Sequence, residues 1–472
     1  TKDDHDHAGP DKRVVLADEQ RSFEAGTWYH ARVEMNGRKM TAQIDEGSKT
    51  GRAVGGEHEM TPLDASVVVI GAGPAGLSAA QALARSGERR ILVLDRDDAA
   101  GGLPRFCHHP GFGWEYSHRL ETGPGFARRL ITALDPTAVT IATRVSALAL
   151  RPGPELDIVG VDCCHLRLRP RAVILATGIR ERPRSARLAP GRRPERGILT
   201  TGMLQQMVAR GVPVAGRRAV VVGTEHVAFS VLMTARRAGL EIVAMVGAED
   251  RVMSYAGAAW FARMLGVPIH LSSEIEDIGG SARVVSVSVR GPTQSHRIAC
   301  DTLIFSGDFI PDAALLHGSE ITVDRRTHGP AIDQYGRTSA RGVFAAGNLL
   351  RAVESSGLAA IEGARVGANA AAYLRDQSDW VDDQATIGLG ETIAHVVPQR
   401  WARDDIGMLA LPIGLRALYD IPRGRVRILE DGTERWSGRS RAILRQRRIA
   451  LPALGFGRLS GRSDAKVTVD AR

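Results

Sequence analysis

A short apolar run that leads directly into a glycine-rich turn constrains this chain more than any other feature. Residues 66–76 read Ser-Val-Val-Val-Ile-Gly-Ala-Gly-Pro-Ala-Gly. An apolar run of this kind is typical of a buried parallel strand, and Gly-x-Gly-x-x-Gly brings the chain to a helix N-terminus that can hold a pyrophosphate. Gly71 permits the tight turn, Gly73 lets the backbone approach the phosphates, and Gly76 allows the helix to pack closely on the strand. The sequence therefore predicts a dinucleotide-binding unit.

The composition is that of a globular protein with a sizeable core and a basic surface. The chain has 472 residues, enough for about two to four domains. Of these residues 43% are hydrophobic, and the formal net charge is +9. The basic residues are dispersed and are not interleaved with aromatic ones, which argues against a nucleic-acid partner. We attribute the positive charge to an arginine-rich composition.

The cysteines argue against disulfide and cluster chemistry. No Cys-x-x-Cys spacing occurs among the four cysteines, which are Cys107, Cys163, Cys164 and Cys300. We therefore expect no disulfide framework, no iron–sulfur cluster within this chain and no metal site. This cysteine usage fits a reducing cytoplasm, and no signal-peptide pattern is present at the start, so we expect a cytoplasmic protein that is not inserted in a membrane.

The first 59 residues differ in composition from the remainder of the chain. They contain four of its five lysines. Residues 27–35 alternate like a strand and lead to an Asn-Gly turn, and residues 39–44 read as a second strand, which together suggest a hairpin. The acidic and histidine-rich stretch 3–7 is interpreted as a solvated tail rather than a metal site. We predict that residues 1–59 are an appended segment, partly disordered.

Later segments complete the site that the glycine turn begins. Asp95 lies 24 residues after Gly71, at the end of the next predicted strand. A carboxylate there suits a ribose diol and repels a 2′-phosphate. Gly102 belongs to a double glycine that lets the chain pass close to a long cofactor, and Arg105 is placed to meet its pyrophosphate. The remaining candidate cofactor contacts are Pro74, Ala75, Arg96, Val145, Ala176, Thr177, Gly178, Gly347 and Asn348.

With these motifs, the chain resembles the two-dinucleotide-domain flavoproteins of the pyridine nucleotide–disulfide oxidoreductase superfamily. The resemblance covers residues 65–375 and rests on the glycine turn, on Ala176-Thr-Gly178 and on the 338–348 segment. It implies FAD lying across the first domain. The superfamily usually has Asp where this chain has Asn348, which would bond to the ribityl chain or a phosphate. Asn keeps an acceptor, so we expect FAD to be retained.

A second glycine turn follows, and it is altered. The segment 220–228, Val-Val-Val-Gly-Thr-Glu-His-Val-Ala, aligns with Gly-x-Gly-x-x-Gly/Ala, with Glu225 in place of the middle glycine. Two like charges about 4 Å apart repel by about 1–4 kcal/mol at surface-like dielectric values. The next predicted strand also lacks an acid at the usual ribose position. We therefore predict a degenerate nucleotide domain and consider NAD(P) binding there doubtful.

The sequence does not assign the catalytic residues. Disulfide reductases place paired cysteines beside the flavin, and this chain has no such pair. Cys107 is interpreted as a packing residue, with tuning of the flavin as the alternative, and His108 or His109 as a surface residue or an acid/base. The resemblance places Arg351 and Glu354 near the flavin ring, and helix capping is the alternative reading.

A nearer resemblance is to the FAD-bearing subunits of opine oxidase, hydrogen cyanide synthase and hydroxyproline dehydrogenase. It rests on residues 176–183, Ala-Thr-Gly-Ile-Arg-Glu-Arg-Pro, and on residues 197–202, Gly-Ile-Leu-Thr-Thr-Gly. Those subunits often continue into a cysteine-rich iron–sulfur region and work beside a second flavoprotein. Here the C-terminal region contains no cysteine. The resemblance thus implies a small-molecule substrate and a second dehydrogenase or iron–sulfur subunit as partner.

The expected fold class is α/β, with two Rossmann-like three-layer ββα domains, one inserted in the other, and a small β-rich C-terminal domain. The expected boundaries are 60–190 for the first part of the FAD domain, 191–300 for the degenerate nucleotide domain, 301–375 for the second part of the FAD domain, and 376–472 for the C-terminal domain.

We expect an FAD-dependent oxidoreductase, either a dehydrogenase or a dehydrogenase subunit, with an amine, amino-acid-like or hydroxy-acid electron donor. Two alternatives stay open. One is an NAD(P)H-dependent flavin reductase. The other is a flavin-bearing electron-transfer or structural subunit of a larger complex.

Overall fold

The computed structural model divides the chain into two units, Thr1–Pro62 and Leu63–Arg472. The described residues are 29–36, 39–46, 65–160, 165–376, 380, 384–402, 409–440, 442–451 and 464–471. In the first unit, β1 (Tyr29–Asn36) pairs antiparallel with β2 (Lys39–Glu46). This pairing confirms the predicted hairpin strands. The stretch 3–7, the residues at 37–38, and the cysteines Cys163 and Cys164 lie outside the described residues.

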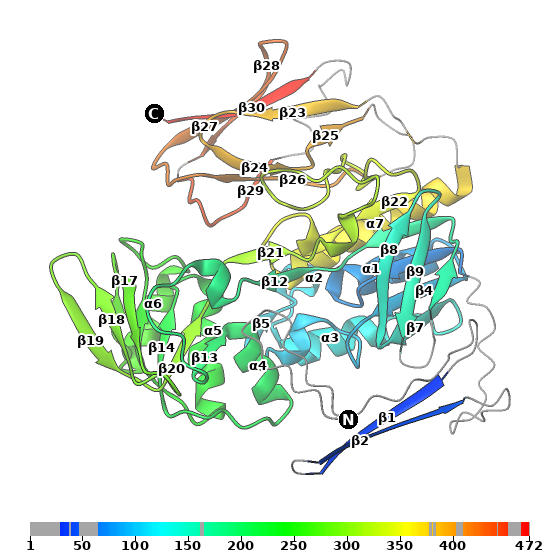
Figure 1. Cartoon of the computed structure of the whole chain (residues 1–472). Helices are drawn as coiled ribbons and strands as arrows, with labels where there is room; N and C mark the ends of the chain where they lie inside the picture. The colour runs from blue at the N-terminus through cyan, green and yellow to red at the C-terminus, as the bar shows by residue number, and fades with distance from the viewer. Residues whose placement is uncertain are drawn as a thin grey trace, which may run out of the picture. The chain divides into compact units, whose positions relative to one another are not determined.

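The second unit begins with a five-stranded parallel sheet in the order β22-β11-β3-β4-β7 (Figure 1). Its strands are fully or largely apolar because helices cover one face and a three-stranded antiparallel sheet, β10-β9-β8, covers the other. The parallel strands are β3 (Val67–Ile70), β4 (Ile91–Asp95), β7 (Val139–Thr143), β11 (Ala172–Leu175) and β22 (Val343–Ala345). The antiparallel strands are β8 (Val145–Arg151), β9 (Glu155–Gly160) and β10 (Leu166–Leu168).

Of the three main helices of this domain, two are brought into backbone contact by glycines. The helices are α1 (Pro74–Arg85), α3 (Gly123–Thr132) and α7 (Ser356–Asp376). A Cβ atom at Gly363 would lie 2.0 Å from the carbonyl oxygen of Ala75, and one at Gly367 would lie 2.3 Å from that of Ala79. Because these glycines are four residues apart, they lie on one face of α7. The helix that closes the domain is thereby packed directly on the helix that opens it.

The second nucleotide domain repeats this three-layer plan. Its parallel sheet has the order β13-β20-β14-β15-β16, and β17-β18-β19 forms the antiparallel layer. Along β14, Ala219 and Val221 pack against the helices, whereas Val220 packs against the antiparallel layer. This alternation is what a strand buried on both faces requires. The parallel strands are β13 (Ile198–Thr200), β14 (Arg218–Val222), β15 (Glu241–Val246), β16 (Ile269–His270) and β20 (Thr302–Phe305).

The helices of this domain are α4 (Thr201–Ala209), α5 (His226–Arg237) and α6 (Ala256–Met264), and its antiparallel strands are β17 (Glu274–Gly279), β18 (Ser286–Arg290) and β19 (Ser295–Ala299). Because β20 pairs with both β13 and β14, the domain extends past the predicted boundary at residue 300. That boundary was placed one strand too early. The chain leaves and re-enters the first domain through β12 (Ile179–Glu181) and β21 (Phe309–Pro311), which pair antiparallel.

The C-terminal domain is built from strands, as predicted. One sheet has the order β25-β23-β30-β27-β28 and the other β24-β26-β29, with an apolar core of their own. The strands are β23 (Ala385–Leu389), β24 (Ile393–Val397), β25 (Arg400–Trp401), β26 (Ile413–Ala417), β27 (Gly424–Glu430), β28 (Thr433–Ser440), β29 (Ile449–Leu451) and β30 (Ala465–Ala471). The hairpin of β27 and β28 turns at Asp431 and Gly432, both with positive φ, the combination that a two-residue hairpin favours.

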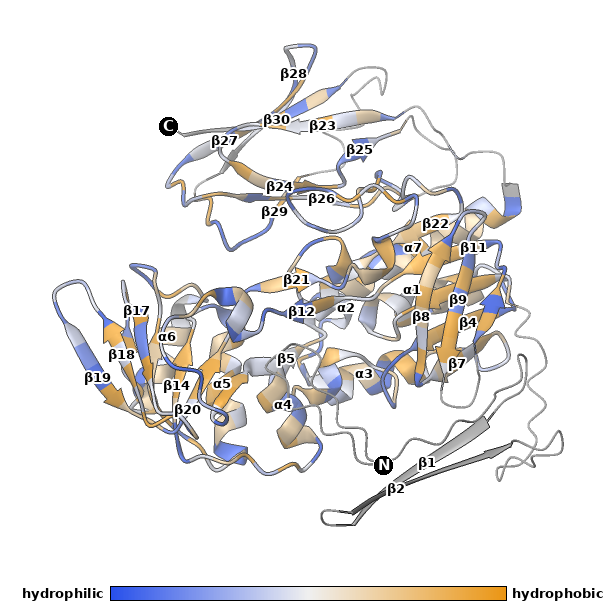
Figure 2. Cartoon of the chain, viewed as in Figure 1, coloured by the Kyte–Doolittle hydropathy of each residue, from blue (hydrophilic) through white to orange (hydrophobic). Residues whose placement is uncertain are grey.

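Hydrophobic residues are concentrated in the strands of the two parallel sheets (Figure 2). Among the described residues, no helix combines the length and the apolar character needed to cross a lipid bilayer.

Candidate functional site

The predicted cofactor residues lie at one edge of the first parallel sheet. Ala345, Leu175, Ile70, Leu94 and Ala142 are in register across its five strands, so the segments that follow these residues emerge side by side. In this sheet β4 and β7 lie on one side of β3, and β11 and β22 lie on the other. The edge beside β3 is therefore a topological switch point, where open α/β sheets bind their ligands.

At this switch point the glycines lie directly against backbone atoms. A Cβ at Gly71, which has φ of +106°, would lie 2.3 Å from the carbonyl oxygen of Ala176. A Cβ at Gly76 would lie 1.9 Å from the carbonyl oxygen of Gly71, and one at Gly102 would lie 2.8 Å from Cα of Gly73. The glycine turn, the double-glycine segment and the end of β11 thus meet as bare backbone.

The first turn of α1 is open to an anion. Gly73 is the N-cap and makes no side-chain capping bond, and Pro74 follows it. A Cβ at Gly347 would lie 2.7 Å from Cβ of Ala75, so the last predicted segment reaches this same helix start. N–H groups at a helix N-terminus favour a phosphate. The structure therefore brings Gly71, Gly73, Ala75, Gly76 and Gly347 together at one helix start.

Asp95 ends β4 beside this turn and orders it. Its Oδ2 accepts the Ala72 N–H at 2.7 Å, and its Oδ1 accepts the Asp97 N–H at 2.9 Å. Burial, which exceeds the effect of these hydrogen bonds, raises the pKa of the Asp95 carboxyl. Arg105 makes two ion pairs of 3.0 Å, with Asp97 and Asp98. Arg105 thus braces the loop that follows Asp95.

Asp312 connects the two ends of this edge, and no sequence signal identified it. Its buried carboxylate pairs with Arg96 at 2.8 Å and with Arg180 at 2.6 Å. Its carbonyl oxygen accepts the Thr177 hydroxyl at 2.7 Å, and its N–H donates to the carbonyl of Gly178 at 2.9 Å. Asp312 follows β21, so only the pairing of β21 with β12 brings it here. Arg96 and Thr177 are therefore held by the crossing between the domains.

Asn348 and Glu354 bond to each other in a closed loop. Asn348 Nδ2 donates to the carbonyl oxygen of Glu354 at 3.2 Å, and Asn348 Oδ1 accepts the Glu354 N–H at 2.9 Å. Val145 begins β8, directly after Arg144, whose N–H donates to the carbonyl of Asp97 at 2.8 Å. Residue 145 therefore lies beside the same loop as Asp95.

Arg351 lies in a buried charge cluster. Its guanidinium is 2.7 Å from Glu362 and 3.5 Å from Glu354, and the side chains of all three are at most 7% exposed. Glu362 also accepts the N–H of Gly347 at 2.8 Å. These carboxylates raise the pKa of Arg351 against the opposing effect of burial. The geometry makes Arg351 a structural support of the Gly347 turn, and the supporting residue that sequence reasoning missed is Glu362.

These residues fit the FAD that the sequence predicted. A cradle of glycines that any Cβ would fill, an open helix N-terminus and a carboxylate at the end of β4 are the features that dinucleotide phosphates and ribose require. When bound, FAD supplies the capacity to accept two electrons from a substrate. The chain's own part is to bind and orient the cofactor.

Cys107 and His108 lie beyond the double glycine, facing the second nucleotide domain. Cys107 Sγ is 3.4 Å from Oε1 of Gln205, and the carbonyl of His108 accepts a bond from Arg237 at 2.9 Å. Burial, with a smaller contribution from the charge of Glu181, raises the pKa of the Cys107 thiol to about 12. Since the thiolate is the nucleophile, Cys107 is a packing residue at neutral pH.

We expect Cys107 to resist alkylation in the folded protein. At pH 8 a thiol with a pKa of about 12 is ionised in roughly one molecule in ten thousand, whereas an unfolded cysteine has a pKa of about 8.5. Peptide mapping after iodoacetamide treatment measures the rate at Cys107, with the urea-unfolded protein as the matched control. Labelling of the folded protein at the unfolded rate would contradict this assignment.

The second glycine turn has the backbone of the first but a filled centre. Gly223 N–H donates to Val246 at 2.8 Å and Ser306 N–H to Val222 at 2.9 Å, just as Gly71 donates to Leu94 and Ala176 to Ile70. Glu225 bonds through its carboxyl group to the hydroxyl of Ser306. The carboxyl therefore sits at the switch point of the second sheet.

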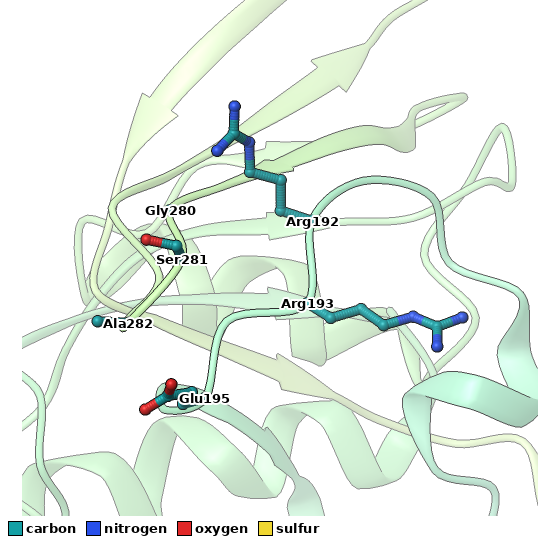
Figure 3. A pocket seen from close by; sticks show the side chains of 6 residues that line it. All are labelled: Arg192, Arg193, Glu195, Gly280, Ser281 and Ala282. Atoms are coloured by element: carbon teal, nitrogen blue, oxygen red, sulfur yellow. The ribbon is translucent and has the colours of Figure 1, made fainter. Parts of the chain in front are cut away.

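A separate cavity of about 460 Å³ lies in the second nucleotide domain (Figure 3). It is lined by Arg192, Arg193, Glu195 and the turn 280–282. The side chains of Arg192 and Arg193 point in different directions (Figure 3), so they do not converge on a single anion. This cavity contains none of the predicted site residues.

Comparison with known proteins agrees with this architecture. The model of the pyridine nucleotide-disulphide oxidoreductase family matches residues 65–365. The sarcosine oxidase alpha subunit of Rhizobium meliloti (strain 1021) is 25% identical over 54% of this chain, and the thioredoxin reductase of Treponema pallidum (strain Nichols) is 26% identical over 61% of this chain and 89% of its own length.

Solved structures show the same fold. The thioredoxin reductase of T. acidophilum has a TM-score of 0.55 at 20% identity, covering 66% of this chain and 98% of that one. The L-proline dehydrogenase of P. horikoshii has a TM-score of 0.50 at 19% identity, covering 67% of this chain and 56% of that one. The chain spans only a quarter of the sarcosine oxidase alpha subunit.

Proposed function

The chain belongs to the pyridine nucleotide-disulphide oxidoreductase family, and from this premise we propose that it is an FAD-dependent dehydrogenase, or the FAD-bearing subunit of one, that does not use the family's nicotinamide or dithiol route. Its electron donor is an amine, an amino-acid-like molecule or a hydroxy acid. The observation that carries the proposal is the contrast between the two glycine turns, one an open cradle and the other filled by Glu225.

The nature of the donor is supported by the relatives and by the absent cysteine pair. Sarcosine oxidase is named for an amino-acid substrate, and three alpha subunits of that name are among the similar sequences. A dithiol substrate needs a reactive cysteine pair, and the sequence has no Cys-x-x-Cys or Cys-x₄-Cys spacing. An oxidisable C–N or C–O bond in a small molecule is therefore the better donor for this site.

The proposal is tested by the visible spectrum of the purified protein under anaerobic conditions. We expect an oxidised flavin spectrum that NADH and NADPH leave unchanged. Within a panel of amines, N-methyl amino acids, imino acids and hydroxy acids, we expect at least one compound to bleach it. Immediate bleaching by NADH or NADPH would instead establish the flavin reductase, and a chain without flavin would refute both functions.

That NAD(P)H-dependent flavin reductase is the second candidate. It is favoured by the match to the thioredoxin reductase of Treponema pallidum, which extends over 89% of that enzyme.

A subunit role is also compatible with these relatives. Several are named as subunits or chains of larger enzymes, including a glutamate synthase small chain that is 30% identical over 195 residues. In that case a second dehydrogenase or iron–sulfur subunit completes the electron route. Activity that requires a co-purifying chain, with the flavin already bound to this one, would identify the subunit role.

A further inference from the structure

We infer that two separate parts of this chain close its second nucleotide site: Glu225 at the pyrophosphate position, and the loop after β15, held by the C-terminal domain, beside the ribose position. The family's nicotinamide dinucleotide is thereby excluded. This inference rests on the proposed function and names the residues that restrict its electron donor.

The first closure is made by Glu225 itself. A Cβ at Gly223 would lie 2.6 Å from Oε2 of Glu225, and one at Gly307 would lie 3.0 Å from Cδ of Glu225. The carboxyl thus fills the space between the ends of β14 and β20. In the first domain the corresponding space lies between Gly71 and Ala176, where only backbone is present. A dinucleotide phosphate and the Glu225 side chain cannot occupy the same place.

The Glu225 carboxyl also bonds to one donor that a phosphate could use, although it makes no side-chain capping bond at the start of α5. The hydroxyl of Ser306 donates to it, and the N–H groups of Glu225 and Ala228, at the start of α5, favour its charged form. Arg187 is held beside it through bonds of 2.8 Å and 2.6 Å to the carbonyls of Ser306 and Gly307. Although burial raises the pKa of Glu225 overall, either protonation state leaves the pyrophosphate position occupied.

The loop after β15 then folds over the start of α5. The N–H of Met253 is 3.4 Å from the hydroxyl of Thr224, and the ring of His226 packs edge-on against Tyr255 with centroids 4.9 Å apart. In a nucleotide domain, the end of this second strand is where the adenosine ribose binds. Residues 253–255 therefore cover the path between the ribose and pyrophosphate positions.

The C-terminal domain holds this loop in place. Arg251 donates to Asp420 at 2.8 Å and to Gln446 at 3.1 Å, and Arg445 forms an ion pair with Glu249. The guanidinium of Arg447 lies over the ring of Tyr255 at 5.5 Å. We call these contacts the loop clamp. Arg251 and Glu249, which follow β15, are thus paired with residues of the C-terminal domain.

The test measures binding of NADH and NADPH to the FAD-loaded full chain by anaerobic calorimetry. Four proteins are compared: the unmodified chain, Glu225→Gln, Glu225→Gly, and Glu225→Gly combined with Asp420→Ser and Arg445→Ser. Glu225→Gln keeps the side-chain volume and removes the charge, so it separates steric occupation of the pyrophosphate position from electrostatic repulsion of the phosphates. The clamp residues are partly exposed, and losing such pairs costs little stability. Melting temperature and flavin content verify that each variant is folded.

We expect no binding at millimolar nucleotide for the unmodified chain and for Glu225→Gln. Glu225→Gly should bind weakly, and the combined variant at least tenfold more tightly. Micromolar binding by the unmodified chain or by Glu225→Gln would overturn the closure by Glu225. Equal affinity of Glu225→Gly and the combined variant would overturn the role of the loop clamp, and a folded combined variant that binds nothing would overturn the inference as a whole.

Failure of this inference differs from failure of the proposed function. Binding of NADH that leaves the flavin oxidised contradicts only the closure. Binding that bleaches the flavin contradicts the proposed function as well. An unmodified chain that lacks flavin removes the proposed function, and nucleotide binding is then measured on the flavin-free chains, with the melting temperature alone as the check of folding.

Discussion

Replacing Gly71 by alanine is expected to reduce bound FAD at least tenfold. The new Cβ would lie 2.3 Å from the carbonyl oxygen of Ala176, and the residue has φ of +106°. Forcing a side chain into packed backbone costs about 1–3 kcal/mol, and a strained φ costs a further ~1–3 kcal/mol. About 1.4 kcal/mol corresponds to a tenfold change in affinity. If the turn shifts to relieve even part of this strain, the backbone that binds FAD is displaced, and the affinity for FAD falls by at least that factor.

Gly87→Ala is the matched control for that change. Gly87 has φ of +96° but no atom lies within 4 Å of its Cβ position, so the substitution carries the backbone strain without the clash. The ratio of flavin to protein absorbance after gel filtration measures FAD retention, and thermal melting measures stability. We expect Gly87→Ala to melt at a lower temperature and keep its flavin. If Gly71→Ala kept the full flavin content, the cradle would be misassigned.

Replacing Glu362 by alanine should destabilise the protein strongly and weaken the Gly347 turn. The substitution leaves Arg351 buried with only Glu354 as a partner, and it removes the acceptor of the Gly347 N–H. Breaking a buried ion pair from one side costs about 3–5 kcal/mol. Because Glu354 remains 3.5 Å away, we expect a loss near the lower end, about 3 kcal/mol. Urea unfolding measures this loss, and flavin content reports the turn.

Two further variants separate the roles of Glu362. Glu362→Gln retains an acceptor for the Gly347 N–H but not the charge, so it should keep more flavin than Glu362→Ala at a similar loss of stability. Glu274→Ala breaks an exposed ion pair with Arg290 at 3.0 Å and should change stability by less than ~1 kcal/mol. If Glu274→Ala and Glu362→Ala lowered the free energy of unfolding equally, the buried cluster would contribute no more to stability than an exposed ion pair.

The parallel sheets and the glycine turns could be predicted from the sequence because their signals are local. An apolar strand followed by Gly-x-Gly-x-x-Gly requires only neighbouring residues to be recognised, and its structural counterpart is β3 followed by α1. The hairpin at Asp431 and Gly432 was predictable for the same reason, since an Asp-Gly pair is typical of a two-residue turn with positive φ. The boundary at residue 300 was not, because the sheet that β20 joins is decided by pairing across a hundred residues.

Charged partners were equally beyond prediction. The ion pairs of Arg105 with Asp97 and Asp98 and that of Arg351 with Glu362 could not be predicted from the sequence. A guanidinium is long and flexible, so the carboxylate it meets depends on which elements pack around it.

By itself, the sequence determined that this chain has two glycine turns, one suited to a dinucleotide and one altered by Glu225. The tertiary structure alone decided what that alteration means. It placed the Glu225 carboxyl against Ser306 and set Asp420 and Arg445 of the C-terminal domain on the loop after β15. The physical reason is the range of the interactions. A turn is encoded by adjacent residues through their allowed backbone angles, whereas the closure of a site depends on side chains that only folding brings together.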